Sequence, residues 1–268
     1  MANQNEKIAV VGRGYVGDKI YDFFKSNGYD VYSFDVDREK SDVEKLEDLN
    51  QFGLDFAFIC VPTPMGENGE CNVSITEDVI NRIDAKTIVL ESTISPGTTE
   101  RLENATGKDI LFTPEYFGET LNHPLNSLNV RNFFVIGGRP EVRRRLVELF
   151  KDILQADVKF HLVDSTTAEV IKYMENSFLA TKVIFCEEFA RICDAFNVDY
   201  YDVREGWLLD PRINPSHTFP NKEGSPGFGG KCLPKDISAI IAASKKAGHE
   251  PAFLRSMFDY NKKIRGED

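Results

Sequence analysis

Short apolar runs recur through the first part of the chain, and a polar or amphipathic stretch separates each run from the next. Apolar runs of this kind between turn residues are typical of buried strands. We predict strands at residues 8–11, 30–35, 56–61, 87–90, 109–112, 133–136 and 158–160, with helices between them, among them one through residue 24 and one over 141–152. Strands that alternate with helices predict a doubly wound parallel sheet of the α/β class.

The first predicted strand leads into a glycine-rich turn. Gly12, Gly14 and Gly17 form a G-x-G-x-x-G pattern at the start of a helix, and Asp35 ends the second predicted strand. In a strand–helix–strand unit this pattern serves a tight turn, close approach of a pyrophosphate and helix–strand packing, while the acid contacts the ribose hydroxyls. We therefore predict a site for NAD rather than NADP. Its expected residues are Gly12, Gly14, Tyr15, Val16, Gly17, Asp35, Thr63 and Thr93, the last two in loops at the carboxyl ends of strands.

The pattern changes after Asp164. Residues 170–196 contain no glycine or proline and have helical periodicity, and further helices are expected at 201–209, 237–247 and 252–264, after a loop rich in Pro and Gly at 210–230. We predict a Rossmann-type NAD-binding domain at residues 1–163 and an all-helical domain at 164–268. A long helix placed after a nucleotide-binding domain often serves for dimerisation, so we expect a homodimer through the helical domain.

Composition narrows the function classes. The formal net charge is -11 with no basic stripe, which disfavours a nucleic-acid partner. No signal-peptide core and no apolar run of membrane-spanning length is present, so we expect a cytoplasmic protein without a membrane partner. The five cysteines form no CxxC pair, which argues against zinc, any other metal and disulfides. Cys186 and Cys193 are expected in the core, and Cys60 ends a strand.

Cys232 has a different context from the other cysteines. It follows the glycines of the segment 227–236, and Pro234 suits the first turn of a helix. A cysteine at a helix N-terminus is exposed to the positive end of the helix dipole, which favours the thiolate. We therefore predict that Cys232 is a nucleophile.

Several segments together resemble a known family. The segments 12–17, 60–64, 91–99, 114–116, 168–180 and 227–236 occur in family order. On these motifs the chain resembles the UDP-glucose/GDP-mannose (nucleotide-sugar) dehydrogenases, and within them the UDP-glucose 6-dehydrogenases. The resemblance implies an NAD-dependent four-electron oxidation of the C6 alcohol of a nucleotide sugar, with UDP-glucose as the expected substrate and UDP-glucuronate as the product.

The resemblance also implies catalytic roles. Cys232 would attack the aldehyde formed by the first oxidation, and the thiohemiacetal would become a thioester that water opens. Lys172 and Asn176, one helical turn apart, would stabilise the oxyanion. Asp236 would hold a water or act as a base with Lys172. Glu115 would be the base for thioester hydrolysis, and Thr93 would position the water and contact the cofactor.

The substrate contacts follow from the same resemblance. They are expected from Glu115, Tyr116, Lys172, Asn176, Arg212, Phe228 and Gly229, with Arg212 reaching the sugar nucleotide from the neighbouring subunit. Taken singly, these residues have plainer explanations. Lys172 and Asn176 could be a solvated helix face, Thr93 and Glu115 could be strand-end caps, and Arg212 could be a surface salt-bridge partner.

The chain also departs from the family pattern. The family normally continues into a second α/β domain that supplies much of the nucleotide site, whereas this sequence stops at Asp268. We expect either a minimal form or a domain supplied by another polypeptide. The loop 214–223 is longer than the family's and is either a surface insertion or a partial replacement for lost substrate contacts, and residues 116–119 vary the family's Phe-Leu-x-Glu.

Two other functions remain open at this point. The first is a two-electron β-hydroxyacid dehydrogenase, which shares the fingerprint and the Lys-x-x-x-Asn helix but needs neither Cys232 nor Asp236. The second is a non-catalytic NAD-binding subunit that has lost its substrate domain. Retention of the whole set of candidate catalytic residues argues against it.

Overall fold

The computed structural model describes residues 5–117, 125, 127–220 and 224–267. Residues 118–119 of the variant motif at 116–119 and residues 221–223 of the loop 214–223 lie outside this range, as do residues 1–4. The chain divides into two compact units. The first comprises Met1–Pro64 and Asn72–Lys172, and the second comprises Met65–Cys71 and Tyr173–Asp268.

A seven-stranded sheet forms the centre of the first unit within the described residues. Its strand order is β2-β1-β3-β4-β5-β6-β7. The strands are β1 (Lys7–Val11), β2 (Asp30–Phe34), β3 (Leu54–Ile59), β4 (Ala85–Leu90), β5 (Ile110–Phe112), β6 (Phe133–Gly137) and β7 (Lys159–Val163). All seven predicted strands are present, and the prediction of a Rossmann-type α/β fold is confirmed.

One part of the predicted topology is wrong. β6 pairs with β5 in the antiparallel direction, with Phe112 opposite Gly137, whereas every other neighbouring pair of strands is parallel. Parallel neighbours need a long crossover, which is usually a helix. In the described part of the connection between β5 and β6, the one helical element is the short 3-10 helix η3 (Leu128–Val130), and no helical crossover is present in that part.

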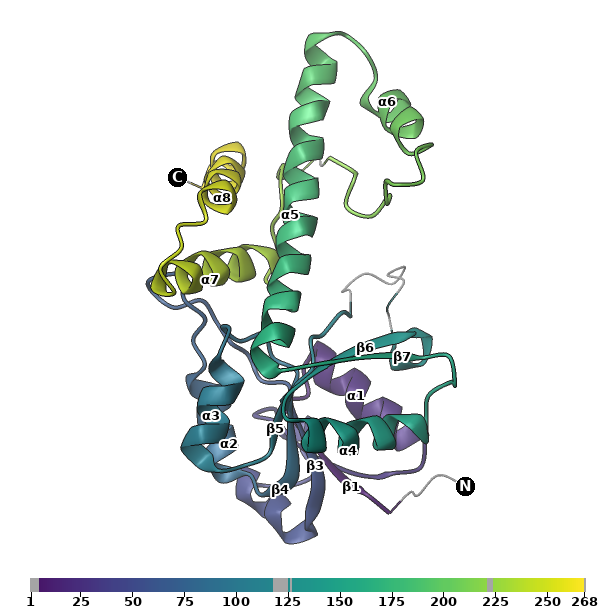
Figure 1. Ribbon diagram of the computed structural model, residues 1–268, viewed down its shortest axis with the longest axis vertical. Coiled ribbons are helices and arrows are strands. Elements are labelled where there is room, and N and C mark those ends of the chain that lie inside the picture. The colour runs from purple at the N-terminus through teal and green to yellow at the C-terminus, as the bar shows by residue number, and fades with distance from the viewer. Residues whose placement is uncertain (1–4, 118–124, 126, 221–223, 268) are drawn as a thin grey trace. The chain divides into compact units, whose positions relative to one another are not determined.

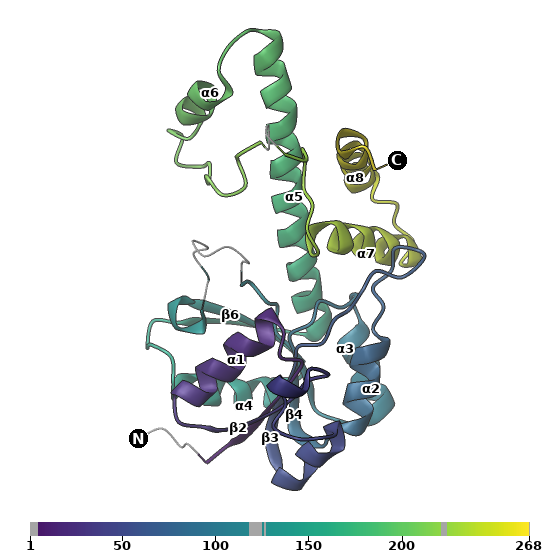
Figure 2. The same cartoon turned by 180° about the vertical axis from the view of Figure 1, so that it is seen from behind.

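Helices cover both faces of this sheet (Figures 1 and 2). α1 (Tyr15–Ser26) and α4 (Pro140–Lys151) pack on one face. The other face is covered by the 3-10 helix η2 (Leu46–Phe52), α2 (Ser74–Arg82) and α3 (Thr98–Thr106). Because side chains alternate along a strand, Ile8 and Val10 of β1 belong to the first core and Ala9 and Val11 to the second.

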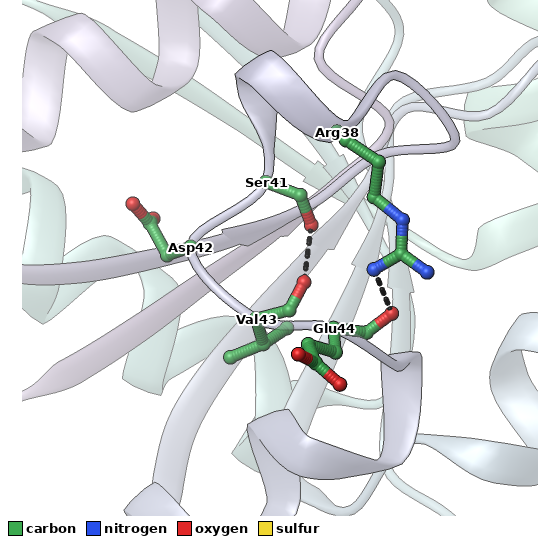
Figure 3. A pocket seen from close by; sticks show the side chains of 5 residues that line it. All are labelled: Arg38, Ser41, Asp42, Val43 and Glu44. Carbon is green, nitrogen blue, oxygen red and sulfur yellow. Dashed lines mark hydrogen bonds between the residues drawn. The ribbon is translucent and has the colours of Figure 1, made fainter.

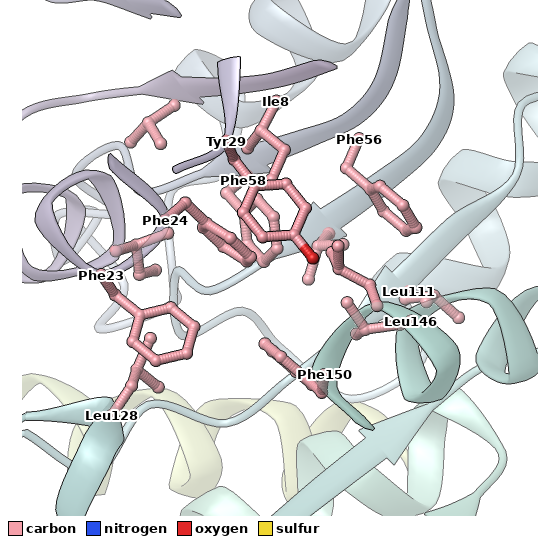
Figure 4. Close-up of a cluster of buried hydrophobic side chains, with 14 of the residues drawn as sticks. Ile8, Phe23, Phe24, Tyr29, Phe56, Phe58, Leu111, Leu128, Leu146 and Phe150 are labelled. Carbon is pink, nitrogen blue, oxygen red and sulfur yellow. The ribbon is translucent and has the colours of Figure 1, made fainter. Parts of the chain in front are cut away.

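Aromatic rings dominate the core under α1 and α4 (Figure 4). Phe24 of α1 is fully buried, and its ring centroid lies 5.1 Å from that of Phe58 on β3 and 6.3 Å from that of Phe150 on α4. Burying one such ring stabilises a fold by about 1.5–3 kcal/mol. This cluster therefore fixes α1, and with it the turn that precedes α1, against the sheet.

The second unit contains helices and one small bridge between Met65 and Cys71. Its helices are α6 (Tyr200–Trp207), α7 (Leu233–Lys246), α8 (Ala252–Arg265) and α5 (Ser165–Ala195), whose first residues belong to the first unit. Ile184, Ile237 and Met257 bring α5, α7 and α8 into one apolar core. Cys186 and Cys193 are buried as predicted. Across the described residues, every helix is too short or too polar to traverse a lipid bilayer.

Two helices begin earlier than predicted because of their first turns. α5 begins at Ser165 rather than at residue 170, since the Asp164 carboxylate accepts hydrogen bonds from the backbone N–H and hydroxyl of Thr167, at 2.8 and 2.6 Å. α7 begins at Leu233, ahead of the helical run expected at 237–247, and Pro234 lies in its first turn as predicted.

Candidate active site

The glycine-rich turn after β1 is fixed by contacts that leave no room for a side chain at Gly12 or Gly17. Gly12 has φ of +90°, and a Cβ there would lie 2.7 Å from the carbonyl oxygen of Cys60, just after β3. A Cβ on Gly17 would lie 1.8 Å from the carbonyl oxygen of Gly12. The turn is therefore packed against the next strand and against its own helix. In this strand order, ligands bind at the switch point between β1 and β3, which is where the turn lies.

Gly14 differs from its two neighbouring glycines. Apart from Gly14 itself and its two chain neighbours, no described atom lies within 4 Å of the position of a Cβ on Gly14, so packing within the protein does not require a glycine there. Gly14 is the N-cap of α1, whose first N–H groups and dipole favour an anion. The open backbone at this position fits the pyrophosphate of a dinucleotide.

Asp35 lies at the end of β2 with its carboxylate already oriented. It accepts hydrogen bonds from the backbone N–H of Arg13 at 2.5 Å and of Asp37 at 2.8 Å. These bonds connect the acid to the glycine-rich turn and hold it beside the start of α1. The residues that follow Asp35 in the chain line a pocket of about 460 Å³. It is lined by Arg38, Ser41, Asp42, Val43 and Glu44 (Figure 3).

The first residues beyond three adjacent strands lie in one row. Each donates its backbone N–H to a carbonyl oxygen of the neighbouring strand. Cys60 donates to Val11 at 2.8 Å, Glu91 to Ile59 at 3.0 Å, and Thr113 to Leu90 at 2.9 Å. The row therefore runs from Cys60 through Glu91 to Thr113 along the carboxyl edge of the sheet. Glu91 belongs to the motif at 91–99, in which no role was predicted for it.

The two predicted threonines meet at the same edge. The Thr63 hydroxyl donates to the carbonyl oxygen of Thr93 at 2.7 Å, and the Ser92 hydroxyl donates to that of Val61 at 2.6 Å. The loops after β3 and β4 are thus bonded to each other, and Thr63 and Thr93 lie together as one would expect for residues that serve one ligand.

Glu115 is buried and highly constrained. One carboxylate oxygen, Oε1, accepts hydrogen bonds from the backbone N–H groups of Tyr116 and Phe117. The Lys172 ammonium donates to the backbone carbonyl of Glu115 at 2.5 Å and lies 5.1 Å from the centre of the Tyr116 ring. The first unit therefore brings together three of the predicted residues, Glu115, Tyr116 and Lys172.

Arg131 was not identified from the sequence. It is only 3% exposed, and one guanidinium nitrogen lies 3.9 Å from Glu115 Oε2. Its guanidinium also lies over the Tyr116 and Phe134 rings, at 4.6 and 4.4 Å from their centres. Burial raises the pKa of the Glu115 carboxyl, and the charges of Arg131 and Lys172 oppose that rise. The only signal in the sequence was a single cation shortly before a strand, which is too common to be diagnostic.

Glu169 was also not identified from the sequence. Its fully buried carboxylate accepts hydrogen bonds from the backbone N–H of Gly97 at 2.5 Å, and from the backbone N–H and hydroxyl of Thr99 at 2.9 and 2.6 Å. It therefore caps the N-terminus of α3 and holds the loop that follows Thr93. Burial is the main reason that the pKa of Glu169 rises to about 7.

Cys232 lies in the second unit at the N-terminus of α7. It is the N-cap of that helix and its side chain is exposed, so the predicted position at a helix N-terminus is confirmed. Its carbonyl oxygen accepts the backbone N–H of Asp236 at 2.9 Å. The buried Asp236 carboxylate accepts a hydrogen bond from the Asn176 amide at 2.6 Å and forms an ion pair with Lys235 at 2.7 Å. Two predicted residues, Asn176 and Asp236, are therefore joined by a direct hydrogen bond.

Side chains of two helices, α5 and α8, bind the backbone of the loop before Cys232. Glu187 of α5 accepts the backbone N–H of Gly227 at 3.0 Å, and the buried Asn261 of α8 binds both backbone groups of Phe228. The Phe228 side chain is buried, with its ring 6.3 Å from that of Phe258. A Cβ on Gly229 would lie 2.8 Å from the Arg265 guanidinium. Substrate contact by Phe228 and Gly229 stays a prediction.

Arg212 forms a bidentate contact with Asp210 close by in the chain. Its nitrogens lie 2.5–3.1 Å from the Asp210 carboxylate oxygens, and 85% of its side chain is exposed. Within this chain, Arg212 is therefore the surface salt-bridge partner that was one of its two predicted roles. The role in binding substrate from a neighbouring subunit stays a prediction.

Comparisons with known proteins account for both units. Residues 47–154 match the NAD binding domain of the UDP-glucose/GDP-mannose dehydrogenase family, and residues 166–263 match its central domain. The chain is 31% identical to YtcA of Bacillus subtilis, a proposed UDP-glucose 6-dehydrogenase, over 95% of this chain and 67% of that protein. The chain belongs to the UDP-glucose/GDP-mannose dehydrogenase family. The resemblance inferred from the motifs is thereby confirmed, and NAD is the cofactor of this nucleotide-sugar dehydrogenase family member.

Other relatives within the family differ in their named substrates. A UDP-N-acetyl-D-mannosamine dehydrogenase of Methanococcus vannielii is 28% identical over 97% of this chain and 66% of its own length. The solved UDP-glucose dehydrogenase of Pyrobaculum islandicum has a TM-score of 0.84 and 26% identity, over 97% of this chain and 68% of that one. The chain thus spans about two thirds of the length of these relatives.

Proposed function

We propose that this family member is an NAD-dependent nucleotide-sugar 6-dehydrogenase that oxidises a C6 alcohol to a carboxylate, with UDP-glucose as the preferred substrate. The observation that carries the proposal is the exposed Cys232 at the N-terminus of α7, with the Asn176–Asp236 hydrogen bond one turn into the same helix. A two-electron alcohol dehydrogenase has no need of a nucleophile in this position.

The first unit supplies the cofactor site in this proposal. The backbone at Gly12, Gly14 and Gly17 binds the pyrophosphate, with Tyr15 and Val16 in the same turn. The oriented Asp35 carboxylate accepts hydrogen bonds from the ribose hydroxyls. Thr63 and Thr93 lie at the strand-end edge that faces the ligand in folds of this class. When bound, NAD accepts one hydride in each of the two oxidations.

Cys232 carries the covalent chemistry. After the alcohol has become an aldehyde, the thiolate Sγ attacks C6, a C–S bond forms, and the carbonyl electron pair moves to oxygen to give a thiohemiacetal. Oxidation of that adduct gives a thioester. Water then attacks the thioester carbon, the C–S bond breaks, and the products are the sugar carboxylate, the Cys232 thiolate and two protons.

The remaining candidate residues assist these steps. Lys172 and Asn176 donate to the developing oxyanions, and Asp236 orients the Asn176 amide through their hydrogen bond. Glu115 takes the proton from the attacking water, which Thr93 positions. Tyr116, Arg212, Phe228 and Gly229 contribute to binding of the sugar nucleotide, with Arg212 acting from the neighbouring subunit of a homodimer.

The exposed face of α5 supports a dimer. Met174, Phe178, Phe185 and Phe189 lie along this helix and Phe196 follows its last residue, with 75%, 62%, 47%, 39% and 77% of their surfaces exposed. Their spacing of four and seven residues places them along one stripe of a helix. An exposed apolar stripe of this length marks an interaction surface, and a second copy of α5 would bury it.

Turnover stoichiometry tests the reaction. The purified protein would be incubated with NAD and with UDP-glucose, UDP-N-acetylmannosamine or GDP-mannose in turn, and NADH and sugar product would both be quantified. We expect two NADH for each UDP-glucose consumed. One NADH for each substrate would instead indicate a two-electron dehydrogenase, and failure to reduce NAD with any sugar nucleotide would contradict the proposal.

A cysteine variant tests the nucleophile. Cys232→Ser should lose the four-electron turnover because an alcohol is a far weaker nucleophile and leaving group than a thiol. The buried Cys193 provides a control, and Cys193→Ala should retain turnover. A Cys232→Ser protein that turns over as fast as the parent would exclude Cys232 as the nucleophile.

A further inference from the structure

Glu91 is a buried carboxyl group whose role is not explained by any predicted function. It follows β4 directly, is 8% exposed, and lies between Cys60 and Thr113 in the row at the carboxyl edge of the sheet. The Thr113 hydroxyl donates to Glu91 Oε1. A carboxylate this deeply buried would normally be paired with a cation or several donors. Glu91 has instead a second carboxyl group, Glu115, as its neighbour.

Glu115 has one oxygen that is fully satisfied and one that is not. Oε1 accepts two backbone N–H groups, whereas Oε2 is buried without a hydrogen-bond partner among the described residues. Arg131 lies 3.9 Å from Oε2, which is too far for a hydrogen bond. Glu91 lies within hydrogen-bonding reach of Glu115. A proton on Glu91 would supply the donor that Glu115 Oε2 lacks.

The charges around the two carboxyl groups indicate where the proton resides. Burial and the negative charge of Glu115 raise the pKa of Glu91 to about 8. Glu115 is closer to positive charge, since Arg131 and Lys172 both favour its ionised form, as do the N–H groups of Tyr116 and Phe117. Burial raises the pKa of the Cys60 thiol well above the ordinary value, and the negative charges of Glu91 and Glu115 add to this rise.

We propose that Glu91 is a positioning residue that shares one proton with Glu115, donating it in a hydrogen bond to Glu115 Oε2 while Glu115 carries the negative charge. The inference rests on the proposed function in one respect, namely that Glu115 is the base. In that step the ionised Glu115 accepts one proton from water, the pair then holds two protons, and the second proton returns to solvent after hydrolysis. Glu91 thereby keeps the Glu115 carboxylate anionic and oriented, and the positive charge of Arg131 balances the negative charge of Glu115.

Two variants of Glu91 separate the shared proton from simple packing. Glu91→Gln keeps the shape and provides an N–H donor without a charge, so we expect kcat at pH 7 within about three-fold of the parent. Glu91→Leu fills similar space but cannot donate, and leaving Glu115 Oε2 without a donor should lower kcat by about ten-fold or more. Equal losses in both variants would overturn the proposal.

A stability measurement tests the pair without relying on activity. The folded-state pKa of Glu91 lies above the ordinary value of 4.5, so its protonation stabilises the fold at low pH and this stabilisation is lost as the pH rises from about 4.5 to about 8. The amide introduced by Glu91→Gln does not titrate. The melting temperature of Glu91→Gln minus that of the parent should therefore increase over this range, whereas the difference for the exposed Glu141→Gln should stay constant.

The infrared spectrum at pH 7 provides a direct readout of the proton. The parent should show a protonated carboxyl band that loses intensity in Glu91→Gln and not in Glu141→Gln. Parallel melting profiles for Glu91→Gln and the parent, with an unchanged infrared band, would exclude the shared proton even if turnover is as proposed. A changed band and a divergent profile in a protein without turnover would support the pair and reject the proposed function alone.

Discussion

Asn261 binds both backbone groups of Phe228. The amide oxygen of Asn261 accepts the Phe228 N–H at 2.8 Å, and its amide nitrogen donates to the Phe228 carbonyl oxygen at 3.1 Å. Asn261 is only 1% exposed and lies on α8, 33 residues from its partner. This two-bond contact fixes the segment that leads, four residues later, to Cys232.

Replacing Asn261 should therefore disturb Cys232 through the loop. Asn261→Leu leaves a buried N–H and a buried carbonyl without partners, which should cost about 2–6 kcal/mol of unfolding free energy. It should also change the rate at which iodoacetamide alkylates Cys232. Asn104 is an exposed asparagine of α3 and serves as a control, since Asn104→Leu should change neither quantity. An unaltered alkylation rate in a folded Asn261→Leu protein would show that the contact does not position Cys232.

Two glycines of the same loop provide a matched pair of substitutions. Gly227 and Gly230 have φ of +75° and +76°, so alanine is strained at both positions by about 1–2 kcal/mol. Only Gly227 is also crowded, because a Cβ there would lie 2.3 Å from the Asn261 amide oxygen. Gly227→Ala should therefore be less stable than Gly230→Ala by about 1–3 kcal/mol in urea unfolding. Equal losses would mean that the loop can move away from Asn261.

Substitutions at two glycines of the turn after β1 should separate effects on cofactor binding from effects on folding. Gly17→Ala places a Cβ 1.8 Å from the Gly12 carbonyl oxygen and should destabilise the first unit by about 3 kcal/mol. Gly14→Ala meets no described atom within 4 Å, so its melting temperature should stay close to that of the parent. Its methyl group would instead meet the cofactor. NAD should bind about ten-fold more weakly, a loss of about 1.4 kcal/mol measurable by calorimetry. Normal NAD affinity in Gly14→Ala would place the pyrophosphate elsewhere.

The strands of the sheet and the Gly12–Gly17 turn were predictable because each depends on local sequence. Apolar runs in the sequence predict buried strands without knowledge of the fold. The close contacts that require glycine at positions 12 and 17 arise within this type of turn and its neighbouring strand. The direction of β6 was not predictable from local pattern, since apolar runs are alike in parallel and antiparallel neighbours. Direction is determined by the connection, which here has no helical crossover in its described part.

The candidate site was only partly predictable for a related reason. Cys232 and Gly14 belong to motifs in which a short stretch of chain produces the chemistry. Arg131, Glu169 and Asn261 act through partners 16, 70 and 33 residues away in the sequence, and a single buried charge or amide has no local signature. Such residues become visible only when the fold shows which polar groups they satisfy.

Glu169 should make the stability of the first unit depend on pH. Its folded-state pKa of about 7 lies above the ordinary value of 4.5, so the stabilisation from its protonated form is lost as the pH rises between these values. Glu169→Gln removes this titration, and its melting temperature relative to the parent should increase from pH 4.5 to pH 7. Glu169→Ala leaves the N–H groups of Gly97 and Thr99 without an acceptor and should cost about 2–4 kcal/mol at any pH in this range. A parent-like profile for Glu169→Gln would show that Glu169 is already ionised at pH 5.

The exposed stripe on α5 makes a prediction about assembly. Phe178 and Phe185 lie seven residues apart on this helix, and 62% and 47% of their surfaces are exposed. If a second copy of the chain covers them, Phe178→Glu together with Phe185→Glu would bury two charges in an apolar interface, and the dimer should dissociate. Light scattering on a sizing column should then report the mass of one chain, against twice that mass for the parent.

The control for this experiment is another exposed phenylalanine of the second unit. Phe253 of α8 is 65% exposed and lies outside the stripe, so Phe253→Glu should leave the dimer intact. Circular dichroism would verify that the double variant keeps its helices. A parent that is monomeric at micromolar concentration would refute the proposed dimer, and a double variant that stays dimeric would place the interface elsewhere. If Arg212 acts from the neighbouring subunit, the monomeric variant should also have a raised KM for the sugar nucleotide, because it has lost a binding residue while Cys232 remains in place.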